Sequence, residues 1–129
     1  MTTATADTFA TLLEGFFMPR LMQQQRASPH TIASYRDTFR LLLKYMYKHL
    51  GTSPSKLAFE QLDAVLITNF LGDLERERGV STRSRNLRLS AIRSSFHYAA
   101  FEAPAHPAQT RRILAIPRKR APRNQVSHL

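Results

Sequence analysis

The chain contains no cysteine and no tryptophan among its 129 residues, and only nine acidic residues stand against nineteen lysines and arginines. The absence of cysteine excludes disulfides and thiolate metal sites, and it suits a reducing cytoplasm, where we expect the protein to act. No apolar run approaches the roughly 20 residues that a membrane span needs. The N-terminus also lacks the basic start and small-residue cleavage site of a secretory signal. These absences favour a soluble protein with no membrane partner.

Acidic residues are scarcest where basic residues are densest. Residues 1–77 carry eight charges of each sign, whereas residues 78–129 carry eleven lysines and arginines and a single acid, Glu102. The whole net charge of +10 therefore belongs to the second segment. Such segregation is the pattern expected of a protein that docks on a polyphosphate. A solvated basic tail is the plainer alternative, but several of these positive charges lie inside a helix-forming segment, so nucleic acid is the leading partner.

The apolar residues recur at the three- and four-residue spacing of amphipathic helices, and no segment alternates as a half-buried strand does. Four helices are predicted, over residues 8–25, 29–49, 63–78 and 81–101. Good N-cap residues precede the last three of them, namely Ser28, Asp63 and Ser81. Pro19 predicts a kink or a break in the first helix near Met18. The expected fold class is all-α, a bundle of four to five helices.

The chain is expected to form one helical domain over residues 1–102, followed by a basic, proline-containing connector over residues 103–129. Two glycines, Gly51 and Gly79, follow predicted helices at positions where a left-handed residue commonly ends them. The connector is expected to be extended, and its cations Arg118, Lys119 and Arg120 would follow a phosphate backbone.

Five polar side chains of the fourth predicted helix share one stripe, because their spacing is +3, +4, +3 and +4: Arg83, Asn86, Ser90, Arg93 and His97. The opposite, core-facing side is expected to hold Leu89, Ile92 and Phe96, widened by Leu87. Arginine can pair with phosphate or guanine, asparagine can read adenine, and serine can donate to a phosphate oxygen. An ordinary solvated face mixes acids with lysines, but residues 81–100 contain no acid. The stripe therefore predicts a nucleic-acid interface.

Four motifs, in order along the chain, resemble one known family. Ser28–Arg36 (SPHTIASYR) is similar to the opening of the second helix in the core-binding domain of tyrosine recombinases, the phage integrase and Xer-type family. Arg88–Tyr98 (RLSAIRSSFHY) resembles that domain's fourth helix. His106–Ala108 resembles the family's Asn-Pro-Ala, with His in place of Asn, and Ile116–Pro122 resembles its basic interdomain connector.

The resemblance implies a SAM-like bundle that forms one half of a C-shaped clamp around double-stranded DNA, with its second and fourth helices facing the major groove. It supports the stripe of the fourth helix and adds residues of the second as DNA contacts: His30, Thr31, Ser34 and, further along, Lys44. Amides of the first turn of that second helix could also meet a phosphate. Tyr35 and Arg36 belong to the motif, but Tyr35 lies on the apolar stripe and is expected in the core.

The family breaks and rejoins DNA with a tyrosine nucleophile and a set of arginine, lysine and histidine residues, all in a second domain. This chain stops where that domain would begin, so we expect no catalytic residue, metal site, cofactor or small-molecule substrate in it. The implied role is to bind one recombination half-site within a recombinase assembly. Contacts between protomers by the first helix would leave Phe9, Phe16 or Phe17 partly exposed, whereas simple core packing would bury them.

Two other classes of function stay open. A small helical protein–protein interaction domain, such as a truncated regulator of a full-length recombinase, would not need an acid-free helix. A basic RNA-binding protein would usually present stacking aromatic residues, whereas the aromatic residues here fall on apolar stripes.

Overall fold

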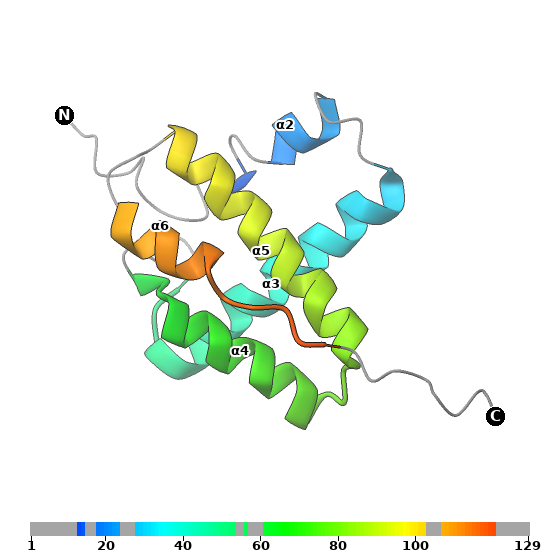
Figure 1. Cartoon of the computed structure of the whole chain (residues 1–129), viewed down its shortest axis with the longest axis vertical. Coiled ribbons are helices and arrows are strands. Elements are labelled where there is room, and N and C mark those ends of the chain that lie inside the picture. The colour runs from blue at the N-terminus through cyan, green and yellow to red at the C-terminus, as the bar shows by residue number, and fades with distance from the viewer. Residues whose placement is uncertain are drawn as a thin grey trace.

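The computed structural model describes residues 13–14, 18–23, 28–53, 56, 61–102 and 107–120. These residues form helices and no strand, which confirms the all-α prediction. Figure 1 shows the helices in chain order, α2 (Met18–Gln23), α3 (Pro29–Leu50), α4 (Ala64–Glu77), α5 (Thr82–Glu102) and α6 (Pro107–Leu114).

Helix α3 begins and ends where local chemistry predicts. The Oγ of Ser28 accepts a hydrogen bond from the Thr31 amide at 3.1 Å, and Pro29 occupies the first turn, where a missing amide costs nothing. Gly51 ends the helix with φ of 70°, a conformation that an L side chain rarely adopts, and its amide donates to Tyr47 O at 2.9 Å. The predicted limits of this helix are confirmed.

Helices α4 and α5 are capped by the two other predicted residues. The Oδ1 of Asp63 accepts from the Leu66 amide at 2.8 Å, and the Oγ of Ser81 accepts from the Ser84 amide at 3.1 Å. Gly79, with φ of 66°, turns the chain between the two helices. A three-residue connection, residues 78–80 before the Ser81 cap, therefore sets α5 directly against α4.

Helix α5 is the centre of the bundle. It packs against α3, α4 and α6, while α2 packs against α3 (Figure 1). Its side chains Leu89, Ile92 and Phe96 are fully buried, as the apolar stripe predicts. They meet fully buried side chains from the rest of the bundle, namely Leu42, Met46, Leu62, Ile67, Phe70, Leu71 and Ile113.

The expectation of an extended chain from residue 103 is wrong in part, because Pro107–Leu114 is a helix. Pro107 is its first residue, a position that favours proline. Thr110 and Ile113, one turn apart, are buried, and Gln109 donates a hydrogen bond to the backbone oxygen of Leu62. Packing against α4 and α5 thus stabilises a short basic segment whose own apolar pattern is weak. The chain becomes irregular after it, at residues 116–120.

Leu87 was expected to widen the core contact of α5, but its side chain is 55% exposed. It lies two residues before Leu89, about 200° away around the helix, and so faces away from the core. Val65 of α4 is also exposed.

Much of the first predicted helix lies outside the described residues, including Phe9, Phe16 and Phe17, as does the end of the connector beyond residue 120. Within the described part, α2 begins at Met18 and Pro19 is its second residue. Residues 15–17, where the predicted break would be seen, lie outside the described residues. The guanidinium of Arg20 lies 5.1 Å from the ring centroid of Tyr98, a cation–π contact between α2 and α5.

The two leucines of α5 give a matched test of this packing. Leu89→Ala removes a fully buried side chain and is expected to lower the free energy of unfolding by about 2–5 kcal/mol. Leu87→Ala makes the same chemical change on the exposed side and is expected to stay within about 0.5 kcal/mol. Urea denaturation followed by circular dichroism measures both, and equal losses would contradict the orientation of α5.

Candidate nucleic-acid interface

The structure places the five stripe residues on the side of α5 that faces away from the core. Arg83 and His97 are exposed, whereas Asn86, Ser90 and Arg93 are half-buried. No hydrogen bond or ion pair within the described residues engages the side chain of Arg83 or Arg93. The two guanidiniums are therefore available to an anionic partner.

The segment Ile116–Arg120 covers part of this stripe. It leaves α6 and runs back between α4 and α5 toward the start of α5 (Figure 1). The side-chain amide of Asn86 donates to Lys119 O at 2.8 Å and accepts from the Lys119 amide at 3.0 Å. The Oγ of Ser90 accepts from Arg118 at 2.7 Å. Two residues expected to contact DNA directly are thus bonded to the connector.

Two further contacts hold the same segment. Lys119 Nζ lies 3.0 Å from a carboxylate oxygen of Glu75 on α4. Arg85 of α5, whose residue surface is 6% exposed, donates to Pro117 O at 3.3 Å and to Asn86 Oδ1 at 3.1 Å. The buried side chain of Ile116 anchors the beginning of the segment. The connector is therefore docked on α4 and α5 through residue 119.

Docking brings two rows of positive charge together. Arg118 and Arg120 of the connector are exposed, and the contacts of Asn86 and Ser90 set them beside the stripe that carries Arg83 and Arg93. The positive charge of Lys119 is offset by Glu75. Because α5 carries no acid before Glu102, the combined surface has a strongly positive potential, which suits a polyanion.

The start of α3 offers less to a phosphate than predicted. Pro29 has no amide hydrogen, the Thr31 amide donates to Ser28 Oγ at 3.1 Å, and the Ile32 amide donates to Ser28 O at 3.0 Å. Of the backbone amides in this first turn, only that of His30 has no acceptor among the described residues. His30 is exposed, whereas Thr31 and Ser34 are half-buried.

Arg88 joins α5 to this part of α3. Its guanidinium lies 2.9 Å from a carboxylate oxygen of Asp37 and donates to Thr38 Oγ1 at 3.1 Å and to Ser34 O at 3.4 Å. These contacts assign Arg88 to packing between α3 and α5. The same contacts bring Ser34 close to α5.

Lys44 lies apart from the α5 stripe. It lines a hollow of about 180 Å³ between α3 and α4, where the other charged residues are Lys48, Arg78, Asp73 and Glu77. The two acids lower the positive potential there, so this part of α3 suits a polyanion less than α5 does.

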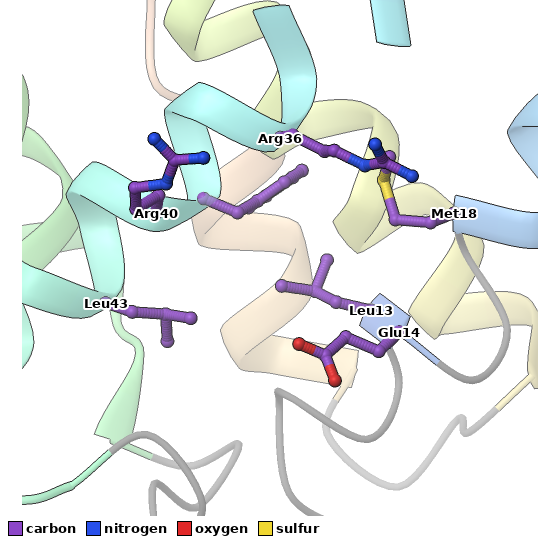
Figure 2. A pocket seen from close by; sticks show the side chains of 7 residues that line it. Leu13, Glu14, Met18, Arg36, Arg40 and Leu43 are labelled. Atoms are coloured by element: carbon purple, nitrogen blue, oxygen red, sulfur yellow. The ribbon is translucent and has the colours of Figure 1, made fainter. Parts of the chain in front are cut away.

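A larger hollow, of about 460 Å³, lies between α2 and α3. Figure 2 shows Leu13, Glu14, Met18, Arg36, Arg40 and Leu43 around it, with the Arg36 side chain extended toward Met18 and Arg40 directed away from Leu13. Its mixture of apolar, acidic and basic side chains differs from the acid-free stripe of α5.

The environment of Tyr45 does not favour its ionisation. Burial, followed by the charge of Asp73, raises the pKa of Tyr45, which is opposite to what a phenolate nucleophile needs. No group of three or more potential metal ligands occurs among the described residues. No helix in the same residues is long and apolar enough to cross a membrane.

Sequence reasoning missed Arg85 and Glu75 as parts of this surface. Arg85 precedes Leu89 by four residues, so helical spacing alone assigns it to the core side of α5. Its pairing with Pro117 O, 32 residues away, has no sequence signal. Glu75 lies 44 residues from Lys119 in the sequence, and only the fold brings the two side chains together.

Two arginines of α5 separate a packing role from a surface role. Arg88→Met removes the hydrogen bonds to α3 and is expected to lower the free energy of unfolding by about 1–3 kcal/mol. Arg93→Met removes no contact within the described residues and is expected to change that free energy by less than about 0.5 kcal/mol. Thermal and urea denaturation of both variants make the comparison. A larger loss for Arg93→Met would contradict these assignments.

Comparison with known proteins agrees with this architecture. The family described as phage integrase, N-terminal SAM-like domain, matches residues 15–103. Two Sinorhizobium fredii proteins that carry the name integrase/recombinase, y4rC and y4rD, are 62% and 44% identical to the chain over 120 residues, or 93% of it. The chain spans 36% and 43% of their lengths. No solved structure gives a significant match. The chain belongs to the family of phage integrase N-terminal SAM-like domains.

Proposed function

We propose that this chain is the DNA-binding module of a site-specific tyrosine recombinase and that it clamps double-stranded DNA at a recombination half-site. One observation carries the proposal. The connector is hydrogen-bonded along the acid-free face of α5, so that Arg83 and Arg93 lie on one element and Arg118 and Arg120 on the element beside it. Two adjacent rows of guanidiniums match the closely spaced phosphates of a duplex.

The side-chain types indicate which residues suit phosphate contacts and which suit base contacts. Arginines on the connector are suited to phosphate contacts, which position a protein but discriminate little between sequences. Arg83 and His97, exposed on the outer side of α5, are suited to meet base edges in the major groove, which admits a helix. His30, exposed at the start of α3, is suited to make a further phosphate contact.

The family and its named relatives support a role in DNA recombination. In this proposal the chain binds DNA and does not cut it, because cleavage by this family needs the residues of a second domain. The proposal includes contacts between neighbouring protomers on DNA, and it assigns the chain no cofactor and no small-molecule substrate.

A second candidate function, a protein-docking domain, is favoured by the outer face of α3. Tyr47 is 58% exposed, Leu50 is 44% exposed, and a shallow apolar hollow is lined by Leu43 and Tyr47 with Arg40 and Lys44. Such a face could receive an apolar segment of a partner protein.

Salt dependence tests the proposed function directly. Fluorescence anisotropy on a duplex of about 30 base pairs is expected to give a log–log salt slope of about −3, because phosphate contacts by Arg93, Arg118 and Arg120 contribute about −0.9 each. Single-stranded DNA of the same length is expected to bind more weakly. No binding to the duplex at low salt would contradict the proposal and favour the protein-docking function.

Charge reversal locates the interface. Arg93→Glu is expected to weaken duplex binding by about tenfold or more, since it removes an attractive charge and adds a repulsive one. Arg40→Glu is the matched control, because it changes the net charge equally. Thr38 faces α5, because it accepts a hydrogen bond from Arg88. Arg40 lies two residues further along α3, about 200° around the helix, and so faces away from α5. Equal losses in the two variants would show that only net charge matters and would remove α5 from the interface.

A further inference from the structure

The side-chain amide of Asn86 bonds to both backbone polar groups of Lys119. Its Nδ2 donates to Lys119 O at 2.8 Å, and its Oδ1 accepts from the Lys119 amide at 3.0 Å. This is the pair of bonds that one strand residue exchanges with another in an antiparallel sheet. The same two atoms would be required to read adenine in the major groove. Asn86 therefore cannot read a base while the connector is docked.

Neighbouring contacts reinforce this arrangement. Arg118 donates to Ser90, Lys119 pairs with Glu75, and Arg85 donates to Pro117 O. Each of the residues 117–119 thus has its own contact with α4 or α5. Of these contacts, only the one with Glu75 is an ion pair. Asn86 alone binds both the backbone donor and the backbone acceptor of one residue, Lys119.

Arg85 adds a reason for Asn86 to stay in place. Its guanidinium is buried, and the described residues supply neither a hydrogen-bond partner for its Nε nor a carboxylate. Asn86 Oδ1 and Pro117 O are the acceptors of its Nη1. A buried charged donor is costly to leave without acceptors. The Asn86 oxygen therefore serves both Arg85 and the connector.

We propose that Asn86 is a positioning residue that fixes the connector against α5, and that it affects DNA binding through the connector cations and not by reading a base. Its effect on DNA rests on the proposed function, whereas the docking itself does not. The exposed side chains of α5 that could then meet base edges are Arg83, His97 and Leu87. Leu87 is included because an apolar side chain can contact the methyl group of thymine.

A double-mutant cycle tests whether Asn86 affects DNA binding through the connector. Asn86→Ala is expected to weaken duplex binding about tenfold, the loss expected for a pair of hydrogen bonds of modest net strength. Lys119→Pro removes the amide hydrogen that Asn86 accepts, and in that background Asn86→Ala is expected to change binding by less than about twofold. Lys119→Ala is the matched control, because it keeps the backbone amide, and there the tenfold loss is expected to persist.

Two results would overturn the proposal in this cycle. A loss that stays near tenfold in the Lys119→Pro background would mean that Asn86 acts independently of the connector. A change in base preference caused by Asn86→Ala, measured on duplexes that differ at single positions, would mean that it contacts a base directly.

Hydrogen exchange of the Lys119 amide, measured by NMR on the protein without DNA, separates docking from function. Asn86→Ala is expected to speed this exchange by about tenfold, whereas Asn69→Ala, an exposed asparagine on α4, is expected to leave it unchanged. Equal exchange in both variants would overturn the docking role even if DNA binding is intact. Faster exchange in a protein that does not bind duplex DNA would keep the docking role and overturn the proposed function.

Discussion

The burial of one side of α5 is the constraint on which the rest of the structure depends. Leu89, Ile92 and Phe96 are fully buried, and α3, α4 and α6 pack around them. A helix enclosed on that side by three neighbours has only its outer side left for a partner. The core thus fixes which side of α5 faces outward, and the connector determines how much of that side stays open.

Much of the helical framework could be predicted because its signals are local. Ser28, Asp63 and Ser81 act within one turn of their own helices, and Gly51 needs only its own backbone conformation. Helix α6 could not be predicted in this way. Its apolar pattern depends chiefly on Ile113, whose burial requires α4 and α5 to be in place first. A short basic segment is helical here because of tertiary packing, which sequence periodicity does not record.

In the candidate site, too, the features set by local helix geometry could be predicted, whereas those set by contacts distant in sequence could not. Helical spacing correctly put Arg83, Asn86, Ser90, Arg93 and His97 on one side of α5, but it said nothing of what each side chain bonds to. Asn86 and Lys119 are 33 residues apart, and their pairing appears only when the chain returns along the helix. Arg85 was overlooked because a charged residue at a core-side position looks anomalous until Pro117 O and Asn86 supply its acceptors. Residue type indicates what chemistry each side chain could offer, and topology decides which side chains are bonded to the connector.

The nature of the docking contacts bears on how salt acts on this protein. Arg118 and Arg120 are held near Arg83 and Arg93, so repulsion between like charges opposes docking in the free domain. Salt screens that repulsion, whereas the bonds between Asn86 and the Lys119 backbone involve no ionised group and are little affected. The one ion pair, Lys119 with Glu75, is exposed and contributes little on its own. Added salt should therefore leave the connector docked while it weakens contacts with phosphate, so the salt slope of DNA binding reports the interface and not a loss of the folded surface.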